Sequence, residues 1–502
     1  MSAAGSVRHR LPVPSVVGHV NGLALFIAGS GMVLSALVGA LTDGEDIALL
    51  GGCGVTVGAI GASAWRLTRV PARLRNVDVF AVVTSTWVAI AIAGAVPYRL
   101  SGAARSFDDA LFESVSGFTT TGATILRPIE DVSAGLLFWR SLSQWLGGMG
   151  VIVLVIAALP AVAAGGMHLL QAESPGPTGE RLTPRVRHTA LRLWAIYGGF
   201  TIVLALAYAI AGMSPYDAVC HSFTTVSTGG FSPHSRSLGH FDSATIEWIA
   251  IAAMFVAGGN FTLYYRLVRG RAGPLLHSAE FRVYAALVAS ASITCYLVAG
   301  AGSGPDALRD ATFSVVSVVS TTGFVTADFE LWTDPGQMVL LLLMPLGAMS
   351  GSTAGGVKVV RAMAVASHAW RESLRQLHPR LVKPVRIGRE PLDEAVTGKV
   401  LGFLVLALTV LGIGFFLITL TGADLVSAAA GSATTFGNVG PGLGAIGPTD
   451  DFLELARPAR WVGTFSMLLG RLEIYPVLLA LAALPRPRAI GRRRRAERLT
   501  PR

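Results

Sequence analysis

The sequence contains little charge. Only 14% of its 502 residues are Asp, Glu, Lys or Arg, whereas soluble domains carry about 25%. Long uncharged runs account for the deficit, since 52% of the residues are apolar and the mean hydropathy is +0.58. These values exclude an ordinary soluble domain and predict an all-α polytopic membrane protein.

Cysteine is also scarce, and the three cysteines, Cys53, Cys220 and Cys295, show no CxxC or other ligand spacing. This absence excludes zinc, haem and iron–sulfur sites built on cysteine. We expect the three thiols to be buried as small apolar side chains. The sequence has no HExxH motif either, so no metalloprotease centre is predicted.

Apolar runs long enough to cross a bilayer are plentiful, because a spanning helix needs about 20 predominantly apolar residues. Ten spans are predicted: 17–41, 47–65, 77–99, 134–162, 189–212, 244–265, 280–301, 336–357, 396–421 and 461–484. The first follows Arg8 and Arg10 and lacks a clear small-residue cleavage site. We therefore expect a transmembrane helix there and not a removed signal peptide.

The net charge of +10 is distributed unevenly. Of the 40 Lys and Arg, 31 fall in six segments: 1–16, 66–76, 163–192, 266–282, 358–399 and 484–502. By the positive-inside rule these segments and both termini are cytoplasmic, which predicts a multi-pass membrane protein and no nucleic-acid partner. The basic run "RPRAIGRRRRAER" is interpreted as a topology anchor, with binding to anionic lipid or a partner as the alternative.

One unit occurs four times along the chain: an apolar span, a short helix, a Thr/Ser/Gly bend, a polar stretch and a second span. The bends are "SGFTTTGAT" from Ser116, "TTVSTGGFS" from Thr224, "VVSTTGFVT" from Val318 and "TTFGNVGPG" from Thr434. Their glycines are Gly122, Gly229, Gly323 and Gly440, at spacings of 107, 94 and 117 residues. Acids precede the bends and further glycines follow in the next spans: Asp109, Asp217, Asp310 and Asp424, then Gly147, Gly258, Gly347 and Gly470.

The short helices, of about ten residues, cannot cross a bilayer. A non-helical bend at membrane depth is tolerated only where it lines water or is buried in protein. Each copy should therefore dip in and return to the same side, and four such loops around one axis would enclose a pore. The two N-terminal spans, within 17–65, lie outside this repeat.

The composition of the bends suits a cation. Backbone carbonyl rings can replace the hydration shell of an ion, and glycine reaches the positive φ that redirects successive carbonyls. Hydroxyl groups can support the bend, and the C-terminal end of a short helix is partially negative. The alternative is that the glycines only allow close helix packing, but packing glycines would recur at helical spacing inside the spans.

Five motifs resemble those of the Trk/Ktr/HKT superfamily of potassium transporters, specifically its TrkH-type membrane subunits. They are "FWRSLSQWLGGMGVIVL" from Phe138, "STTGFVTADF" from Ser320, "GSTAGGVKVVR" from Gly351, "GNVGPGLG" from Gly437 and "MLLGRLEIYPVL" from Met467. The resemblance covers residues 77–485 and implies four pseudo-symmetric membrane–pore loop–membrane repeats around a central pore. It also implies potassium as the ion, a location in the bacterial cytoplasmic (inner) membrane and a homodimer in membrane lipid. A cytosolic TrkA-type nucleotide-binding regulatory subunit is implied as well, with no organic cofactor on this chain.

The resemblance divides the chain into an N-terminal helix pair, four repeats and a basic tail. The predicted boundaries are 1–70 for the pair, 71–165, 186–270, 276–366 and 392–487 for the repeats, and 488–502 for the tail. The resemblance implies that the filter positions of the family correspond to these potassium-binding residues: Thr120, Thr121, Gly122, Ser227, Thr228, Gly229, Thr321, Thr322, Gly323, Asn438, Val439 and Gly440. The fourth bend lacks the Thr-Gly pattern, so the pore is only pseudo-symmetric.

Two regions are predicted to gate the pore. Arg471 is placed inside the last span, where an arginine costs at least about 2.5 kcal/mol unless it meets water or a partner. The resemblance makes it a cation below the filter; the alternative is a structural ion pair, though not with Glu473, which faces another side of a helix. The stretch "GAMSGSTAGG", 347–356, is too rich in glycine for a good helix. The resemblance makes Gly347, Gly351, Gly355, Gly356 and the following Lys358 an intramembrane gate, with a static kinked helix as the alternative.

Arg140 is interpreted as an interfacial anchor beside Trp139 and Trp145. An enzyme is not expected, because "GAMSGSTAGGVK" lacks the Gly-Lys-Ser/Thr of a phosphate loop and no histidine lies in a span near its serines. The remaining alternative is a sodium-coupled secondary transporter of a small solute, but such folds use inverted repeats and these repeats are parallel. The sequence leaves channel-like flow and coupled symport both open.

Overall fold

The computed structural model describes residues 13–69, 76–150, 186–300, 304–388 and 390–482. Helices dominate this part of the chain, and the strands are four two-residue segments. β1 (Val13–Pro14) pairs in parallel with β2 (Thr68–Arg69), and β3 (Arg386–Ile387) pairs antiparallel with β4 (Glu390–Pro391). The predicted tail at 488–502 and the second half of the span at 134–162 lie outside the described residues.

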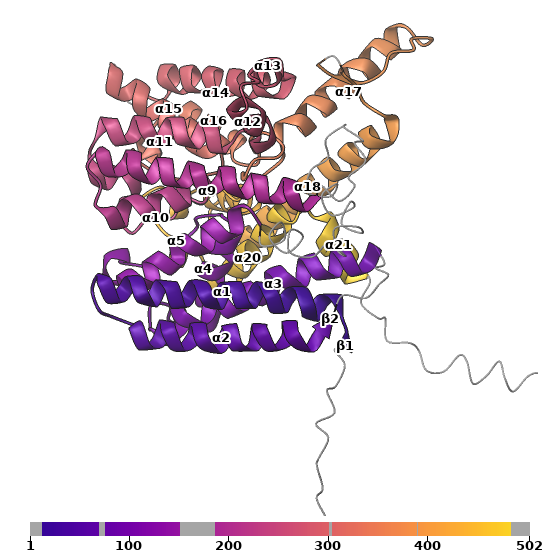
Figure 1. Ribbon diagram of the computed structural model, residues 1–502. Helices are drawn as coiled ribbons and strands as arrows, with labels where there is room; N and C mark the ends of the chain where they lie inside the picture. The colour runs from indigo at the N-terminus through magenta and orange to yellow at the C-terminus, as the bar shows by residue number, and fades with distance from the viewer. Residues whose placement is uncertain (1–12, 70–75, 151–185, 301–303, 389, 483–502) are drawn as a thin grey trace, which may run out of the picture.

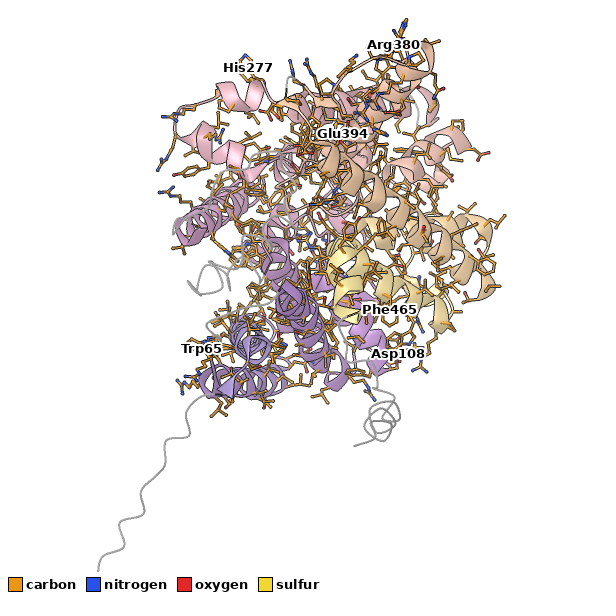
Figure 2. The ribbon with its side chains drawn as sticks, turned by 90° about the vertical axis from the view of Figure 1, so that its right-hand side faces the viewer. Trp65, Asp108, His277, Arg380, Glu394 and Phe465 are labelled. Atoms are coloured by element: carbon orange, nitrogen blue, oxygen red, sulfur yellow. The ribbon has the colours of Figure 1, made fainter. Side chains whose placement is uncertain are left out.

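The first two helices form a tight antiparallel pair at the edge of the bundle. α1 (Val16–Leu41) and α2 (Ile47–Leu67) approach so closely at Gly22, Gly29 and Gly61 that a Cβ there would overlap the partner's backbone. Small residues allow this kind of close contact between membrane helices. Figure 2, viewed from the end that carries β1 and β2, shows the pair at one edge, where Trp65 is labelled.

Four repeats follow, each with a first long helix, a short helix and a second helix. The first helices are α3 (Asn76–Leu100), α9 (Val186–Ile210), α14 (Ala279–Val298) and α18 (Glu394–Leu420). The short helices are α4 (Phe107–Phe118), α10 (Pro215–Val226), α15 (Pro305–Val319) and α19 (Leu425–Gly437). The second helices begin with α5 (Ala134–Gly148), α11 (Ala244–Ala257), α16 (Asp334–Leu343) and α20 (Arg457–Arg471).

Within the described residues, six helices are long and apolar enough to cross a membrane: α1, α2, α3, α9, α14 and α18. Two of the predicted spans are sharply bent helix pairs. α11 is followed after a bend of 103° by α12 (Phe261–Val268), and α20 after a bend of 109° by α21 (Tyr475–Ala482). The predicted spans at 244–265 and 461–484 are thus bent helix pairs; the bends were not predicted, because hydropathy does not register a bend within an apolar run.

The shorter elements complete the chain. Short 3-10 helices follow the bends, one in each of the first three repeats and two in the fourth. They are η1 (Ile129–Asp131), η2 (Ser237–Phe241), η3 (Phe329–Leu331), η4 (Gly444–Ile446) and η5 (Phe452–Glu454). α13 (Gly273–Leu276) precedes α14, and α17 (Val359–Leu377) projects from the bundle at the end that carries β1, β2 and α21 (Figure 1).

The starts of the short helices are set by local capping. Ser106 accepts a hydrogen bond from Asp109 N–H and donates to its carboxylate, and Ser214 and Asp217 repeat this arrangement. Asp424 itself caps α19. Asp310 differs from these three acids, because α15 begins five residues earlier at Pro305, and Asp310 therefore lies inside the helix.

The four repeats surround a common centre in chain order. α5 packs against α10, α11 packs against α15, and α20 packs against α4, so the last repeat closes on the first. Ion pairs also tie the repeats together: Arg127 pairs with Asp451 at 2.6 Å between the loops after two bends, and Arg309 of α15 pairs with Glu247 of α11 at 2.5 Å. This closed arrangement places the four bends at the centre of the bundle.

Candidate ion-conducting site

All four bends have the same backbone conformation. Within two residues of the end of each short helix one residue is left-handed: φ is 55° at Thr120, 55° at Thr228, 57° at Thr321 and 57° at Asn438. The next residue donates its N–H to the carbonyl five residues back in each repeat. These bonds are Thr121 to Ser116 (2.9 Å), Gly229 to Thr224 (2.8 Å), Thr322 to Ser317 (2.9 Å) and Val439 to Thr434 (3.0 Å).

A left-handed threonine is unusual, because its β-branched side chain crowds the backbone there. Three of the four bends nevertheless use one, and the fourth uses asparagine, which tolerates this region better. Strained residues of this kind persist only where the surrounding structure holds them, and they cluster at functional sites. The recurrence at one position in every repeat indicates a shared requirement and not a local accident.

The glycine after each pair also has positive φ, but the predicted register of the second repeat was wrong by one residue. φ is 82° at Gly122, 76° at Gly230, 78° at Gly323 and 108° at Gly440. Gly230, and not Gly229, is thus the equivalent of the other three. The sequence "STGG" offers two adjacent glycines, and only the backbone bonds separate them. The equivalent triplets are 120–122, 228–230, 321–323 and 438–440.

These four glycines close a ring. A Cβ on any of them would collide with a carbonyl oxygen of the next repeat, so only glycine fits without a shift of the neighbouring backbone. The contacts are Gly122 with Gly229 O, Gly230 with Thr322 O, Gly323 with Val439 O, and Gly440 with Thr121 O. The predicted convergence of the four bends on one axis is therefore observed.

The backbone carbonyl oxygens of the four left-handed residues are buried and have no hydrogen-bond donor in the described part of the chain. Their side chains and backbones are fully buried, with 0% exposure at Thr120, Thr228, Thr321 and Asn438. Among the described residues, none donates a hydrogen bond to the carbonyl oxygens of these four. Buried carbonyls without a donor are uncommon in folded proteins and call for a partner such as water or an ion.

Side chains from neighbouring helices hold the bends in place. Gln144 of α5 donates to Gly229 O at 2.6 Å and accepts from Phe231 N–H at 3.1 Å, so the first repeat supports the second. Asn438 donates to the hydroxyl of Thr121 at 2.9 Å and to Met467 O at 3.0 Å. Sequence analysis missed Gln144, although it lies within the quoted motif "FWRSLSQWLGGMG".

Arg140 is a buried structural residue, and its interpretation as an interfacial anchor was wrong. It is 2% exposed and pairs at 2.6 Å with Glu113, which is 0% exposed. It also donates to Ser232 O at 2.8 Å and stacks 3.6 Å above the ring of Phe231. Glu113 in turn accepts from Ile125 N–H at 2.9 Å, so this pair fixes the chain after two bends. The acid within the otherwise uncharged segment "LFESVSGF" of α4 was the signal that could have identified it.

The expected interruption of the third repeat is present. α16 ends at Leu343 and α17 begins at Val359, and residues 344–358, here called the 344–358 loop, contain no helix. The loop contacts the bends directly: Gly355 N–H donates to the Thr321 hydroxyl at 2.8 Å, and Thr353 donates to Val226 O at 3.1 Å. A Cβ on Gly355 would also crowd Asn438. The loop therefore touches the bends of three repeats.

The other predicted gating residues lie around this loop. Gly347 packs against Gly355 O, and Gly351 (φ 72°) and Gly356 (φ 63°) take positive φ. Lys358 is 7% exposed, and its ammonium donates to Ala354 O.

Arg471 ends α20 at the break and does not lie inside a continuous helix. It donates to Thr353 O at 2.7 Å and to Gly147 O and Gly148 O at 2.9 and 3.0 Å. Glu473 pairs with Arg361 of α17, which is compatible with the expectation that Arg471 and Glu473 do not pair.

The cysteines and acids add no further site. Cys53, Cys220 and Cys295 are free and buried, as predicted. Among the residues that the structure describes, no cluster of three or more His, Cys, Asp or Glu is arranged to hold a metal ion.

The profile of the TrkH family, described as "Cation transport protein", matches residues 53–302 and 300–491. The chain belongs to the TrkH family. The Trk system potassium uptake protein TrkH of Halomonas elongata is 38% identical over 473 residues, covering 92% of this chain and 96% of its own length. The TrkH protein of Escherichia coli K12 is 35% identical over 472 residues, covering 92% and 97%.

A solved structure agrees with these relatives. The crystal structure of the potassium transporter TrkH from Vibrio parahaemolyticus superposes with a TM-score of 0.84 at 33% identity, covering 93% of this chain and 98% of that one. The predicted fold and family resemblance are thereby confirmed. TrkH proteins are transport proteins, so the expectation that this chain is a multi-pass membrane protein and not an enzyme is also confirmed.

Proposed function

We propose that this protein takes up potassium ions across the bacterial cytoplasmic membrane through a filter formed by its four bends. The observation that carries the proposal is the closed ring of equivalent triplets, 120–122, 228–230, 321–323 and 438–440. Buried carbonyl oxygens at the left-handed residues would replace part of the hydration shell of the ion. Relatives that are named potassium uptake proteins make potassium the first candidate for the ion.

The filter contacts are backbone carbonyls and not side-chain charges. Thr120, Thr121, Gly122, Thr228, Gly229, Thr321, Thr322, Gly323, Asn438, Val439 and Gly440 remain in the proposed set, Gly230 joins it, and Ser227 becomes a flanking residue. A neutral oxygen ring can bind a cation without placing a fixed negative charge at membrane depth, which would be costly. Asn438 makes the ring unequal, so its selectivity for potassium over sodium should be less strict than in a four-fold symmetric channel.

The 344–358 loop and Arg471 are proposed to control flow below the filter. The loop touches three bends, and the guanidinium of Arg471 ties it to the carbonyl ends of α5. A cation at this position would oppose the passage of another cation, and a glycine-rich loop can change conformation at small cost. Gly347, Gly351, Gly355, Gly356 and Lys358 are the residues proposed to move or to respond.

Orientation and partners follow the same family pattern. We propose that both termini face the cytoplasm, that the chain works as a homodimer in membrane lipid, and that a cytosolic TrkA-type nucleotide-binding subunit regulates it. The nucleotide would bind that subunit, because the bends and the loop described above contain no phosphate-binding motif. Potassium is the transported ion and not a resident cofactor.

The test is uptake of radioactive rubidium into proteoliposomes that contain the purified chain. Potassium should compete with rubidium at lower concentration than sodium does, and Gly323→Ala should abolish uptake. Gly199→Ala is the matched control, because a Cβ there meets no atom within 4 Å. Uptake that required a sodium gradient and a small organic solute would instead support the alternative of a sodium-coupled secondary transporter.

A further inference from the structure

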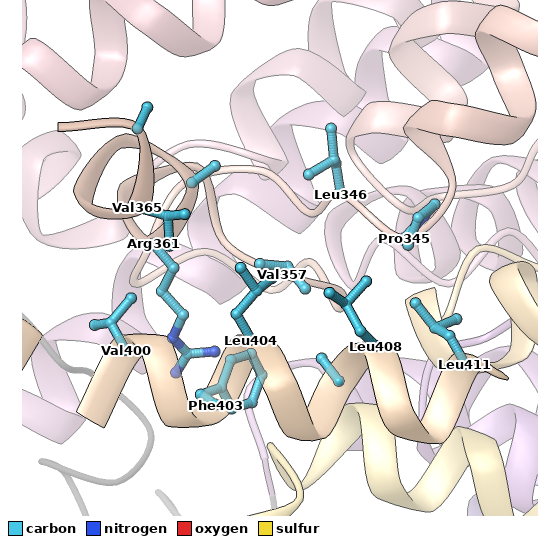
Figure 3. A pocket seen from close by; sticks show the side chains of 13 residues that line it. Pro345, Leu346, Val357, Arg361, Val365, Val400, Phe403, Leu404, Leu408 and Leu411 are labelled. Carbon is cyan, nitrogen blue, oxygen red and sulfur yellow. The ribbon is translucent and has the colours of Figure 1, made fainter. Parts of the chain in front are cut away.

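An apolar pocket lies behind the 344–358 loop, outside the ring of bends. It is a cavity of about 310 Å³ between that loop, the start of α17 and one face of α18 (Figure 3). Twelve of its thirteen lining side chains are apolar, including Leu346, Val357, Leu404 and Ala407. This size and lining are typical of a site for an apolar small molecule or chain.

The one polar lining residue is Arg361, which lies at one end of the pocket while Leu411 lies at the other (Figure 3). Arg361 is only 6% exposed, and its guanidinium stacks 4.0 Å from the centre of the Phe403 ring. Its Nη2 donates to Glu473. Its Nη1 is buried and has no hydrogen-bond partner among the described residues. A buried donor in this state is rare and indicates a missing acceptor.

The charge around this donor suits an anion. Lys358 lies within electrostatic range of the cations Arg361 and Arg471 and of the acids Glu280 and Glu473. Of these groups only Arg361 lines the pocket; its Nη2 pairs with Glu473, and its Nη1 still needs an acceptor. The occupant that fits is therefore an apolar chain with an anionic oxygen at one end.

The surroundings supply such a molecule. α18 exposes large apolar side chains, with Val405 63% and Leu408 59% exposed, and Leu408 also lines the pocket. A pocket whose wall is an exposed residue of a membrane-spanning helix opens toward the bilayer. We propose that one acyl chain of an anionic phospholipid occupies this pocket, with a phosphate oxygen accepting the Nη1 hydrogen bond of Arg361.

The lipid would act as a support for the 344–358 loop. Pro345, Leu346 and Val357 form one wall of the pocket, so an empty pocket leaves that side of the loop without packing. Binding of the lipid does not depend on the proposed transport function. An effect of the lipid on ion flow would rest on the proposal that this loop is the gate.

The experiment is photo-crosslinking of the full chain in vesicles that contain phosphatidylglycerol with a photoactivatable acyl chain, followed by peptide mapping. Crosslinks should concentrate on 345–366 and 400–411 and should be at least fivefold more frequent than with the matching phosphatidylcholine probe. Ala407→Phe, which fills the pocket, should reduce them at least fivefold. Val405→Phe on the same helix is the control and should leave them unchanged. The readout needs no ion flux, so its failure is distinct from a failure of the proposed function.

The headgroup is tested with Arg361→Gln combined with Glu473→Gln, which removes the cation without leaving a buried unpaired acid. Crosslinking of the phosphatidylglycerol probe should fall to the phosphatidylcholine level. Unlabelled phosphatidylglycerol should compete with the probe on the unmodified chain, a measurement that does not depend on whether the variants fold. Labels spread evenly over all helices, crosslinks unaffected by Ala407→Phe, or crosslinks between two copies of the chain across this pocket would each overturn the proposal.

Discussion

The bends and the segments that follow the second helices differ in how closely the four repeats agree. At the bends, every repeat has a left-handed residue, a backbone bond to the carbonyl five residues back and a glycine against the next repeat. Beyond the second helices, the described repeats diverge: α12 turns by 103°, α21 turns by 109°, and the third repeat forms a long loop. Symmetry is kept at the ring that we propose to bind the ion and is lost where the third repeat forms the proposed gate.

The first prediction tests the symmetric ring of bends by adding one methyl group to one of its glycines. Gly230→Ala should reduce rubidium uptake by at least about a hundredfold, because its φ of 76° is unfavourable for alanine and its Cβ would collide with Thr322 O. Gly229→Ala should retain more activity, since its φ is not positive and the three atoms nearest its Cβ belong to the Gln144 side chain and not to the backbone. Equal loss in the two variants would contradict the corrected register.

The second prediction concerns the buried ion pair that holds the first two bends. Arg140→Met should lower the free energy of unfolding by about 3–5 kcal/mol, because Glu113 would remain buried and uncompensated. The double variant Arg140→Met with Glu113→Leu should recover much of that loss. Thermal unfolding in detergent measures both. Arg309→Met is the control, because Arg309 is 19% exposed, and its effect should be smaller.

The third prediction tests the region below the bends, where the repeats differ, by removing the positive charge of Arg471. Arg471→Ala should raise ion flux roughly tenfold, equivalent to about 1.4 kcal/mol, because it removes a positive charge and three hydrogen bonds that fix the loop. Arg460→Ala, on the same helix but paired with Asp109 at 3.3 Å, is the comparison. Flux that stayed at the wild-type rate in a correctly folded Arg471→Ala protein would remove the gating role.

The smallest expected effect tests the strain at the bends. Thr120→Asn should stabilise the protein by about 1 kcal/mol, because asparagine tolerates the left-handed region better than a β-branched residue does. Thr120 is the suitable position, since its hydroxyl makes no hydrogen bond among the described residues. Thermal unfolding provides the measurement, with Thr409→Asn on the exposed side of α18 as a control that should show no gain.

Most of the architecture could be predicted from the sequence, because apolar length and the repeated Thr/Ser/Gly bends are local signals. The register at Gly229 and Gly230 could not, since adjacent glycines are equivalent until the backbone bonds are known. The breaks after Ala257 and Arg471 were missed because apolar composition continues across them. Arg140 was misread because its partner, Glu113, lies 27 residues earlier and only folding brings the two together.

The 344–358 loop belongs to the third repeat but makes contact with the second, third and fourth bends. Any displacement large enough to clear a passage must therefore release supports on three sides of the ring at once. Opening of the proposed gate would then be linked to ion selectivity. When the loop moves away to release the ion, the carbonyl oxygens proposed to select that ion also lose part of their support.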